Sequence, residues 1–221
     1  MNPGPVKPRP VDHAAFVLAN TELGPVPAIP EIVMRQSSDA FTLWERTELE
    51  LEAPDQQPPF WGFGWAGGLA IARYLLDHPQ AVSGATVLDL GSGSGLTAIA
   101  AALAGASEVT ASELDPFALA AITINAAANH VAVRTARDVL DTEPAADVVL
   151  AADIWYERQL AARALRFLER AQARGASILI GDVGRAFLPR TRLRQLAAYQ
   201  VPVNADLEST ATKEAAIFTL A

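Results

Sequence analysis

The chain has 221 residues, which suits a single α/β domain, and no apolar run approaches the roughly 18 residues that would cross a bilayer. Its formal charge of -8 disfavours a protein that follows nucleic-acid phosphates, and the lack of cysteine excludes disulfides, thiolate metal sites and cysteine nucleophiles. With three histidines far apart and no secretion signal in the first ten residues, we expect a cytoplasmic protein without metal, membrane or nucleic-acid partners.

Residues 1–58 are predicted to form an arm and an extension that pack on a core domain, residues 59–221. One short helix is expected there, beginning after the candidate N-cap Asp12 and ending at Asn20. Short runs of strand-forming residues predict strands over 31–35 and 41–46, and the polar, proline-rich stretch 53–59 interrupts regular structure. The core begins with a helix over 67–76, which has apolar residues at helical spacing and ends before Pro79.

From residue 86 onward, strand and helix patterns alternate. The predicted strands cover 86–90, 108–112, 131–137, 147–152 and 177–181, and the helices between them cover 96–104, 117–129 and 156–174. This alternation is typical of a parallel sheet with helices on both faces. Two more strands, 199–207 and 215–220, are joined by a polar turn over 208–214. The predicted fold is α/β and Rossmann-like, a seven-stranded and mostly parallel sheet with a C-terminal antiparallel strand.

A glycine-rich turn joins the strand at 86–90 to its helix. Residues 87–96 read VLDLGSGSGL, in which Gly91, Ser92 and Gly93 bring backbone amides to a helix N-terminus that suits an anionic or polar ligand. Leu96 stands where the dinucleotide fingerprint has its third glycine, which favours S-adenosylmethionine over NAD. Asp89 adds a carboxylate, which suits an ammonium and a sulfonium better than a pyrophosphate. The alternative is an ordinary strand-to-helix turn.

Acidic residues after the next two strands extend this candidate cofactor site. Glu113 lies 113 - 91 = 22 positions after the first glycine, close to the offset of about 20 residues at which a carboxylate binds ribose hydroxyls. Asp115 competes for this role, but before Pro116 it is also a candidate helix N-cap. Asp138 is placed to accept the adenine amino group, with Val139 beside the ring. The alternative is that Asp138 is a surface-loop residue.

Six segments carry a family resemblance. They are FWGFGWAGG (60–68), ARYLLD (72–77), VLDLGSGSG (87–95), ELDP (113–116), ADIWY (152–156) and GDVGR (181–185). Together they resemble the electron transfer flavoprotein β-subunit lysine methyltransferases, a branch of the seven-strand, class I S-adenosylmethionine-dependent protein methyltransferases. The glycine turn is shared by the whole superfamily, whereas the tryptophan segment and the Asp-x-x-Tyr segment are specific to this branch. Residues 1–58 lie outside the resemblance, and Ala66, Glu113 and Val183 depart from the usual family residues.

The resemblance implies a protein-lysine N-methyltransferase whose partner is the electron transfer flavoprotein β subunit. Asp153 and Tyr156 would lie at the mouth of the substrate channel as catalytic residues, with Asp153 orienting the amine, and Trp61 or Trp65 would wall the channel. The alternatives are a packed aromatic at the helix start for Tyr156 and core aromatics for the tryptophans. The cofactor contacts implied are Trp65, Gly91, Ser92, Gly93, Glu113, Asp138, Val139 and Ala152.

Two other functions remain open at this point: a methyltransferase acting on a small molecule or RNA, and a binding module for the cofactor without catalysis. The basic residues Arg185, Arg190, Arg192 and Arg194 are predicted to form a solvated helix face. The alternative is a docking site for an acidic protein surface near the active site.

Overall fold

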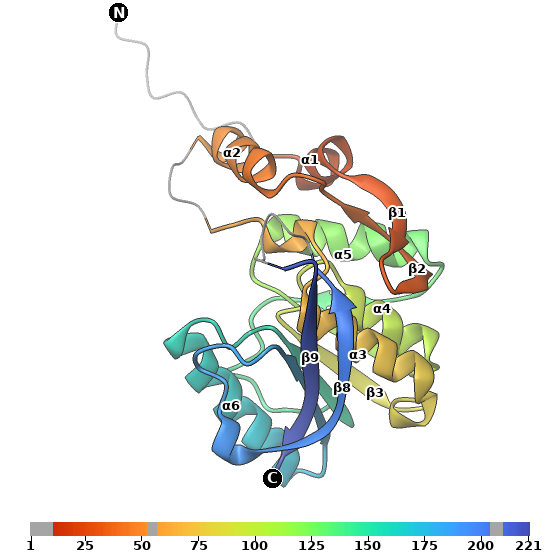
Figure 1. The fold of residues 1–221 in the computed structure, drawn as a ribbon, viewed down its shortest axis with the longest axis vertical. Coiled ribbons are helices and arrows are strands. Elements are labelled where there is room, and N and C mark those ends of the chain that lie inside the picture. Colours follow the sequence, from red (N-terminus) through yellow and green to blue (C-terminus); the bar gives the residue numbers. More distant parts are fainter. Residues whose placement is uncertain (1–10, 53–56, 204–209) are drawn as a thin grey trace, which may run out of the picture.

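The computed structural model describes residues 11–52, 57–203 and 210–221. Within this part of the chain, seven strands form one sheet in the order β5-β4-β3-β6-β7-β9-β8. β9 runs antiparallel to both of its neighbours, and the other pairs are parallel. The predicted fold class is therefore confirmed (Figure 1). The strands are β3 (Thr86–Leu90), β4 (Glu108–Ser112), β5 (Arg134–Ala136), β6 (Val148–Ala152), β7 (Ser177–Asp182), β8 (Leu193–Pro202) and β9 (Thr212–Leu220).

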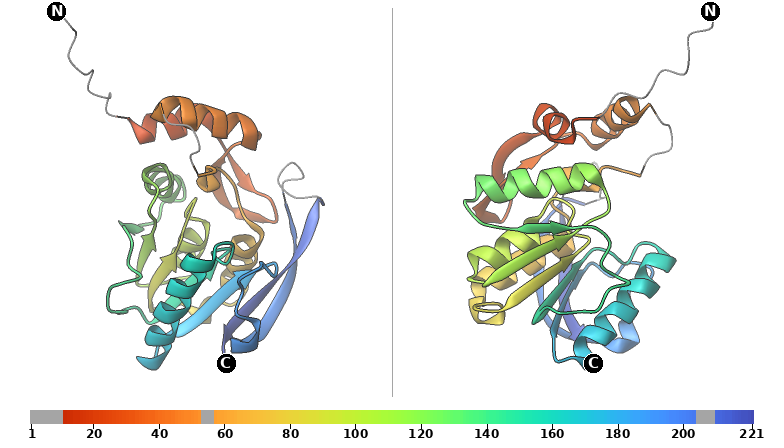
Figure 2. Two further views of the ribbon diagram at one scale, coloured as in Figure 1. Left: turned by 90° about the vertical axis from the view of Figure 1, so that its left-hand side faces the viewer. Right: turned by 180° about the vertical axis from the view of Figure 1, so that it is seen from behind.

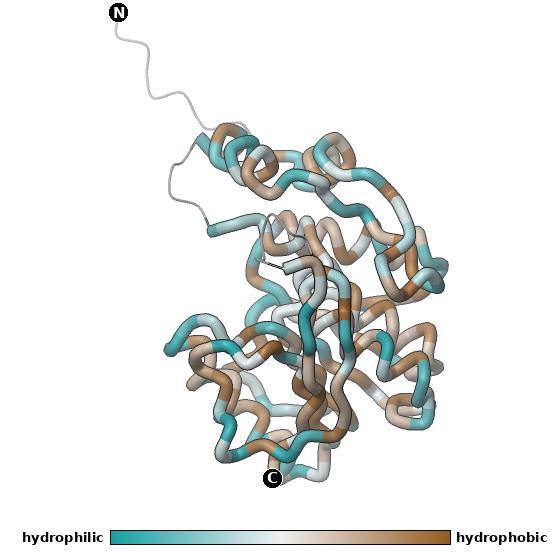
Figure 3. Tube along the Cα trace, in the orientation of Figure 1, coloured by the Kyte–Doolittle hydropathy of each residue, from teal (hydrophilic) through white to brown (hydrophobic). Residues whose placement is uncertain are grey.

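Helices cover both faces of the sheet. Because side chains alternate across a strand, Val87 of β3 packs toward α3 (Ala66–Asp77), α4 (Leu96–Leu103) and α5 (Pro116–Ala128), whereas Leu88 and Leu90 pack toward α6 (Arg158–Ala173). Apolar residues accordingly gather along the central strands, and hydrophilic residues along the outer helix surfaces and loops (Figure 3). Among the described helices, none is long and apolar enough to span a membrane.

The N-terminal extension consists of α1 (His13–Asn20), the hairpin β1 (Glu22–Val26) and β2 (Ile29–Gln36), and α2 (Ala40–Leu51). These elements lie together at one end of the molecule, over α5 (Figures 1 and 2). An aromatic cluster joins them to the core: Phe16 of α1 packs on Trp61, in the short 3-10 turn η1 (Phe60–Gly62), and on Phe117 of α5. The extension is thus packed on the elements that surround the glycine turn.

The strand predicted over 41–46 is wrong, because these residues belong to α2. Asp39 caps this helix, since its side chain accepts hydrogen bonds from the backbone N–H and the hydroxyl of Thr42. The buried residues Ala40, Leu43 and Thr47 recur at helical spacing and dock on the core. The preceding strand, predicted over 31–35, is confirmed within β2, but its partner β1 was not predicted, since Gly24 and Pro25 are residue types that are rare in strands.

The C-terminal part differs in its boundaries. β8 begins at Leu193 rather than at residue 199, because Leu193 already pairs with Leu220 of β9. Arg190 and Arg192 therefore lie in the single 3-10 turn η3 (Arg190–Arg192) and Arg194 lies in a strand, so the predicted basic helix face is wrong. The end of the polar turn predicted over 208–214 is wrong, because residues 212–214 belong to β9. The rest of that turn falls partly on residues 204–209, and the irregular stretch predicted over 53–59 falls partly on 53–56. Both segments lie outside the described residues.

Candidate functional site

A cavity of ≈ 790 Å³ lies where β3, β4 and β6 end, next to the glycine turn. Ligands of open α/β sheets bind at such carboxyl ends, and the volume is that of a small-molecule site. Three parts of the chain surround the cavity: the strand ends of the sheet, the aromatic segment before α3, and the N-terminal extension. Of the residues expected in the site, it is lined by Trp61, Trp65, Gly91, Ser92, Gly93, Glu113, Asp138, Ala152, Asp153 and Tyr156.

The glycine turn has a backbone that side chains would obstruct. Gly91 has a φ of 62°, and a Cβ added there would lie 2.7 Å from Cγ2 of Ile154. Gly95 has a φ of 89°, and its Cβ would lie 3.3 Å from the backbone of Ile122 in α5. The turn is consequently packed against α5 on one side and presents bare backbone to the cavity on the other.

Glu113 links the end of β4 to the glycine turn. Its Oε2 accepts a hydrogen bond of 2.9 Å from the Gly93 N–H, and its Oε1 accepts one of 2.7 Å from the Leu114 N–H. Asp115 caps α5 as expected, because its side chain accepts from the Phe117 N–H at 2.8 Å. Of the two carboxylates, Glu113 therefore lies against the turn, and its assignment to the ribose hydroxyls stays a prediction.

Asp89 supports the turn from within the protein and does not line the cavity. Its Oδ2 accepts hydrogen bonds from the hydroxyls of Ser92 and Thr97, while its Oδ1 is buried without a hydrogen-bond partner among the described residues. Complete burial raises the pKa of Asp89 to about 6, against the lowering effect of the two hydroxyls. Asp89 thus fixes the shape of the turn and places a carboxylate behind it.

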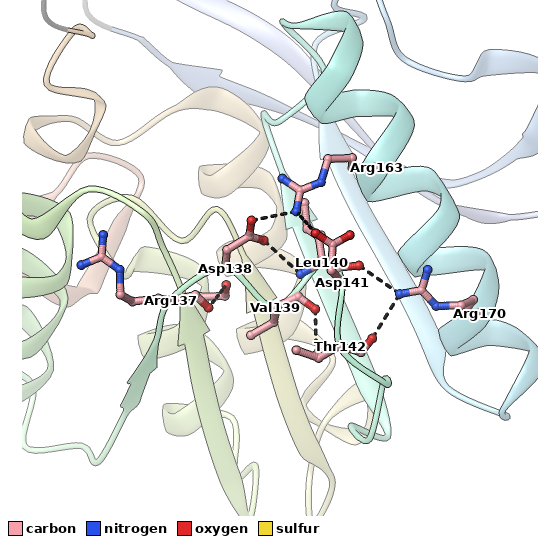
Figure 4. A network of polar contacts seen from close by, with 9 residues as sticks. Arg137, Asp138, Val139, Leu140, Asp141, Thr142, Arg163 and Arg170 are labelled. Atoms are coloured by element: carbon pink, nitrogen blue, oxygen red, sulfur yellow. Dashed lines mark hydrogen bonds and ion pairs between the residues drawn. The ribbon is translucent and has the colours of Figure 1, made fainter.

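An ion pair and a hydrogen bond fix the side chain of Asp138, so it is not a free surface-loop residue. Its Oδ2 lies 2.7 Å from Nη2 of Arg163 in α6, and its Oδ1 accepts a hydrogen bond of 3.1 Å from the Leu140 N–H. Figure 4 shows Asp138 and Asp141 both turned toward Arg163. Asp138 lines the cavity, but its neighbour Val139 does not.

Asp153 directly follows β6 and has a left-handed backbone, at a φ of 59°. Its Oδ2 accepts a hydrogen bond of 2.8 Å from the Gly68 N–H at the start of α3, and its Oδ1 lies 2.5 Å from Nη1 of Arg185. Burial raises the pKa of Asp153 to about 6, and the charge of Arg185 opposes this rise. The carboxylate is therefore paired and anchored while it faces the cavity.

Aromatic rings line the mouth of the cavity beside Asp153. The ring of Phe60 lies 5.6 Å from that of Trp65 and 5.5 Å from that of Tyr156, and the Trp65 indole N–H donates to the Phe60 carbonyl at 2.8 Å. Tyr156 is 45% exposed and precedes α6, so its ring lies at the entrance. Trp61 is 1% exposed and stacks on Phe117, which makes it a core aromatic that borders the cavity.

The structure adds cavity residues that sequence patterns did not identify. His13 of α1 and Thr47 and Leu51 of α2 line the cavity, so the extension forms part of its wall. Arg185 lines it as well, and its guanidinium lies 6.0 Å above the Trp65 ring. No local sequence signal marks these residues as site residues, except that Arg185 falls in the GDVGR segment of the resemblance.

Comparison with known proteins places this arrangement in a family. A family model described as ribosomal protein L11 methyltransferase matches residues 72–182, which run from α3 to the end of β7. The electron transfer flavoprotein beta subunit lysine methyltransferase of Mus musculus is 35% identical over 215 residues, covering 92% of this chain and 82% of the mouse protein. Its counterpart from Danio rerio is 34% identical and covers 94% and 83%. Residues 59–221 make up 163 of the 221 residues. Matches that cover 92% and 94% of the chain must therefore also include most of the N-terminal extension.

The fold is also found among solved methyltransferase structures. Magnesium protoporphyrin IX methyltransferase from Synechocystis, with bound S-adenosylhomocysteine, has a TM-score of 0.52 and 11% sequence identity. The likeness covers 70% of this chain and 82% of that one. The chain is a methyltransferase that belongs to the electron transfer flavoprotein beta subunit lysine methyltransferase family, and it shares its core with the ribosomal protein L11 methyltransferases.

Proposed function

We propose that this protein transfers methyl groups from S-adenosylmethionine to lysine side chains of a protein, and that its substrate is an electron transfer flavoprotein β subunit. One observation carries the proposal: a bare-backbone glycine turn and a paired, cavity-facing carboxylate, Asp153, share one cavity with an aromatic entrance. The curated relatives named above support the choice of a lysine in that subunit.

The residues around the turn suit S-adenosylmethionine, which would supply an activated methyl group. Gly91 and Gly93 line the cavity with left-handed backbones, at φ of 62° and 54°, so a ligand can contact the main chain there. Glu113 would receive the ribose hydroxyls and Asp138 the adenine amino group, since both carboxylates line the cavity. Ser92, Gly93, Trp65 and Ala152 would complete the cofactor contacts, and Asp89 would support them from behind the turn.

The entrance suits a long apolar side chain that ends in an amine. Phe60, Trp65 and Tyr156 offer apolar ring surface to the four methylene groups of a lysine. Free lysine has a pKa near 10.4, yet only the neutral amine has the lone pair that accepts a methyl group. The pairing of Asp153 with Arg185 would offset the carboxylate charge that otherwise stabilises an arriving ammonium, so the ammonium would lose its proton to solvent more readily. Asp153 would then orient the amine by accepting a hydrogen bond from one of its N–H groups.

The test offers radiolabelled S-adenosylmethionine to the purified protein together with the flavoprotein β subunit, ribosomal protein L11, bulk RNA or a mixture of small metabolites. We expect label on the β subunit and, by mass spectrometry, on lysine. Asp153→Asn should lose at least about 100-fold in transfer rate, since it removes a group that acts on the reacting amine, while S-adenosylhomocysteine binds as before.

Asp77→Asn is the matched control, because Asp77 lies at the far end of α3, and it should transfer at the normal rate. Label on L11, RNA or small solutes alone would replace the proposed substrate. If the protein binds the cofactor but transfers no label to any of the offered substrates, it is a binding module without catalysis.

A further inference from the structure

Two asparagines, Asn125 in α5 and Asn129 at its C-cap, bind the backbone of β2, an edge strand of the N-terminal hairpin. Asn129 accepts a hydrogen bond of 3.0 Å from the Val33 N–H and donates one of 2.6 Å to the Val33 carbonyl. Asn125, one helical turn earlier, accepts one of 2.8 Å from the Arg35 N–H. Val33 and Arg35 are two residues apart, so their backbone groups point to the same edge of β2. The asparagines therefore occupy that edge, opposite β1, much as a third strand would.

Asn125 differs from Asn129 in what its other amide atom binds. Its Nδ2 donates a hydrogen bond of 2.9 Å to the carbonyl of Ser94, in the middle of the glycine turn, whereas the Nδ2 of Asn129 donates to the carbonyls of Val33 and Asn125. Asn125 is completely buried, and both of its polar atoms have backbone partners. Because its oxygen faces an N–H and its nitrogen faces a carbonyl, the amide has one possible orientation.

The connection continues from β2 to the wall of the cavity. The Arg35 side chain donates to the carbonyl of Thr21 at 2.8 Å and of Leu18 at 3.3 Å, at the C-terminal end of α1. The other end of α1 brings His13 into the cavity, where its ring packs edge-on against Phe117. Hydrogen bonds thus run from the glycine turn through Asn125 and Arg35 to a helix of the extension.

We propose that Asn125 is a positioning residue for the cofactor: it fixes the Ser94 carbonyl in the glycine turn and couples cofactor binding to the attachment of the N-terminal extension. The proposal rests on the proposed function only in that the turn binds S-adenosylmethionine. Without the Asn125 amide, the Ser94 carbonyl is buried without its donor, and the turn shifts to find another. The coupling is reciprocal, so cofactor in the turn should hold β2 more firmly on α5.

The test compares the same substitution at Asn125 and at Asn129. Asn125→Asp keeps an acceptor for the Arg35 N–H and replaces the donor to Ser94 with an oxygen. Asn129→Asp likewise keeps the acceptor for Val33 and removes the donor, but leaves the turn untouched. Asn125→Asp therefore loses the bond to the glycine turn and keeps its bond to β2, whereas Asn129→Asp loses one of its two bonds to β2. Calorimetric titration with S-adenosylhomocysteine should show at least about tenfold weaker binding for Asn125→Asp, and binding within about twofold of wild type for Asn129→Asp.

Hydrogen exchange of the wild-type protein supplies a second measurement that needs no variant. Saturating S-adenosylhomocysteine should slow exchange of the Arg35 amide at least about threefold, and the Asn125→Asp variant should not show this slowing. Equal binding by the two variants, or a wild-type Arg35 amide that ignores the ligand, would overturn the role of Asn125. A wild-type protein that does not bind S-adenosylhomocysteine would instead remove the proposed function.

Discussion

The ion pair between Arg185 and Asp153 permits a quantitative prediction for Arg185→Gln. Both side chains are largely buried, 17% and 10% exposed, and removing one partner of such a pair costs about 3–5 kcal/mol. Asp153 keeps its hydrogen bond from the Gly68 N–H, so we expect the lower end of this range, about 3 kcal/mol, when the carboxyl is ionised.

The loss should depend on pH in a defined direction. The pKa of Asp153, about 6 in the folded protein, exceeds its ordinary value of 3.8, so its ionisation opposes folding and stability from this group falls as pH rises through about 6. Without Arg185 the folded-state pKa of Asp153 rises further. The destabilisation of Arg185→Gln relative to wild type should therefore be smallest below pH 6, and grow by about 1.4 kcal/mol per pH unit toward pH 8.

Urea unfolding followed by tryptophan fluorescence at pH 5.5, 7 and 8 measures this difference. Arg192→Gln is the matched control, because Arg192 forms an exposed pair with Glu169 and should lose less than about 1 kcal/mol at every pH. A destabilisation of Arg185→Gln that stays constant from pH 5.5 to 8 would refute the reasoning, because the carboxyl of Asp153 would then not respond to the missing charge.

Gly67→Ala should cost about 1–3 kcal/mol in urea unfolding, because the new Cβ would lie 2.2 Å from the Gly181 carbonyl, whereas Gly68→Ala, whose Cβ meets nothing closer than 3.9 Å, should lose no stability. Equal destabilisation of the two variants would show that the contact between α3 and β7 adjusts easily to an added methyl group. The free energy of unfolding of Asp89→Asn, relative to wild type, should rise by up to roughly 3 kcal/mol from pH 4 to pH 7, since the raised pKa of Asp89 makes its ionisation oppose folding. Parallel pH profiles of the free energy of unfolding for the variant and the wild type would contradict this expectation. Tyr156→Phe should lower kcat about tenfold and leave S-adenosylhomocysteine affinity unchanged, because we expect the Tyr156 hydroxyl to hydrogen-bond the reacting amine; an unaltered kcat would leave the hydroxyl without that role.

Much of the sheet could be predicted because its signals are local. β3 and β4 have the predicted bounds, since each is a short run of mainly apolar or β-branched residues flanked by residues that favour turns. The same locality explains the error at α2, where Phe41, Thr42 and Trp44 are residue types common in strands within a stretch of six residues. The cap at Asp39 and the docking of Leu43 on the aromatic cluster favour the helix.

The residues of the candidate site likewise divide into those that the sequence predicts and those that it does not. Glu113 and Asp153 were identifiable because parallel strands bring their carboxyl ends to one edge, so residues that follow strands converge wherever the rest of the chain lies. The long-range pairs could not be identified from the sequence, since no periodic pattern relates Asp153 to Arg185, 32 positions later, or Asn125 to Arg35, 90 positions earlier.

Short-range pattern and turn chemistry are encoded residue by residue, and so the positions of most strands, the glycine turn and its acidic neighbours follow from the chain read alone. Burial and long-range pairing exist only once the chain is packed. Packing places His13 in the cavity wall, pairs Asp153 with Arg185, and turns Trp61 into a core residue that stacks on Phe117. The place of His13 depends on where the extension docks, and the other two contacts on how distant segments of the core pack together; both are set by shape and by polar pairing across the sequence.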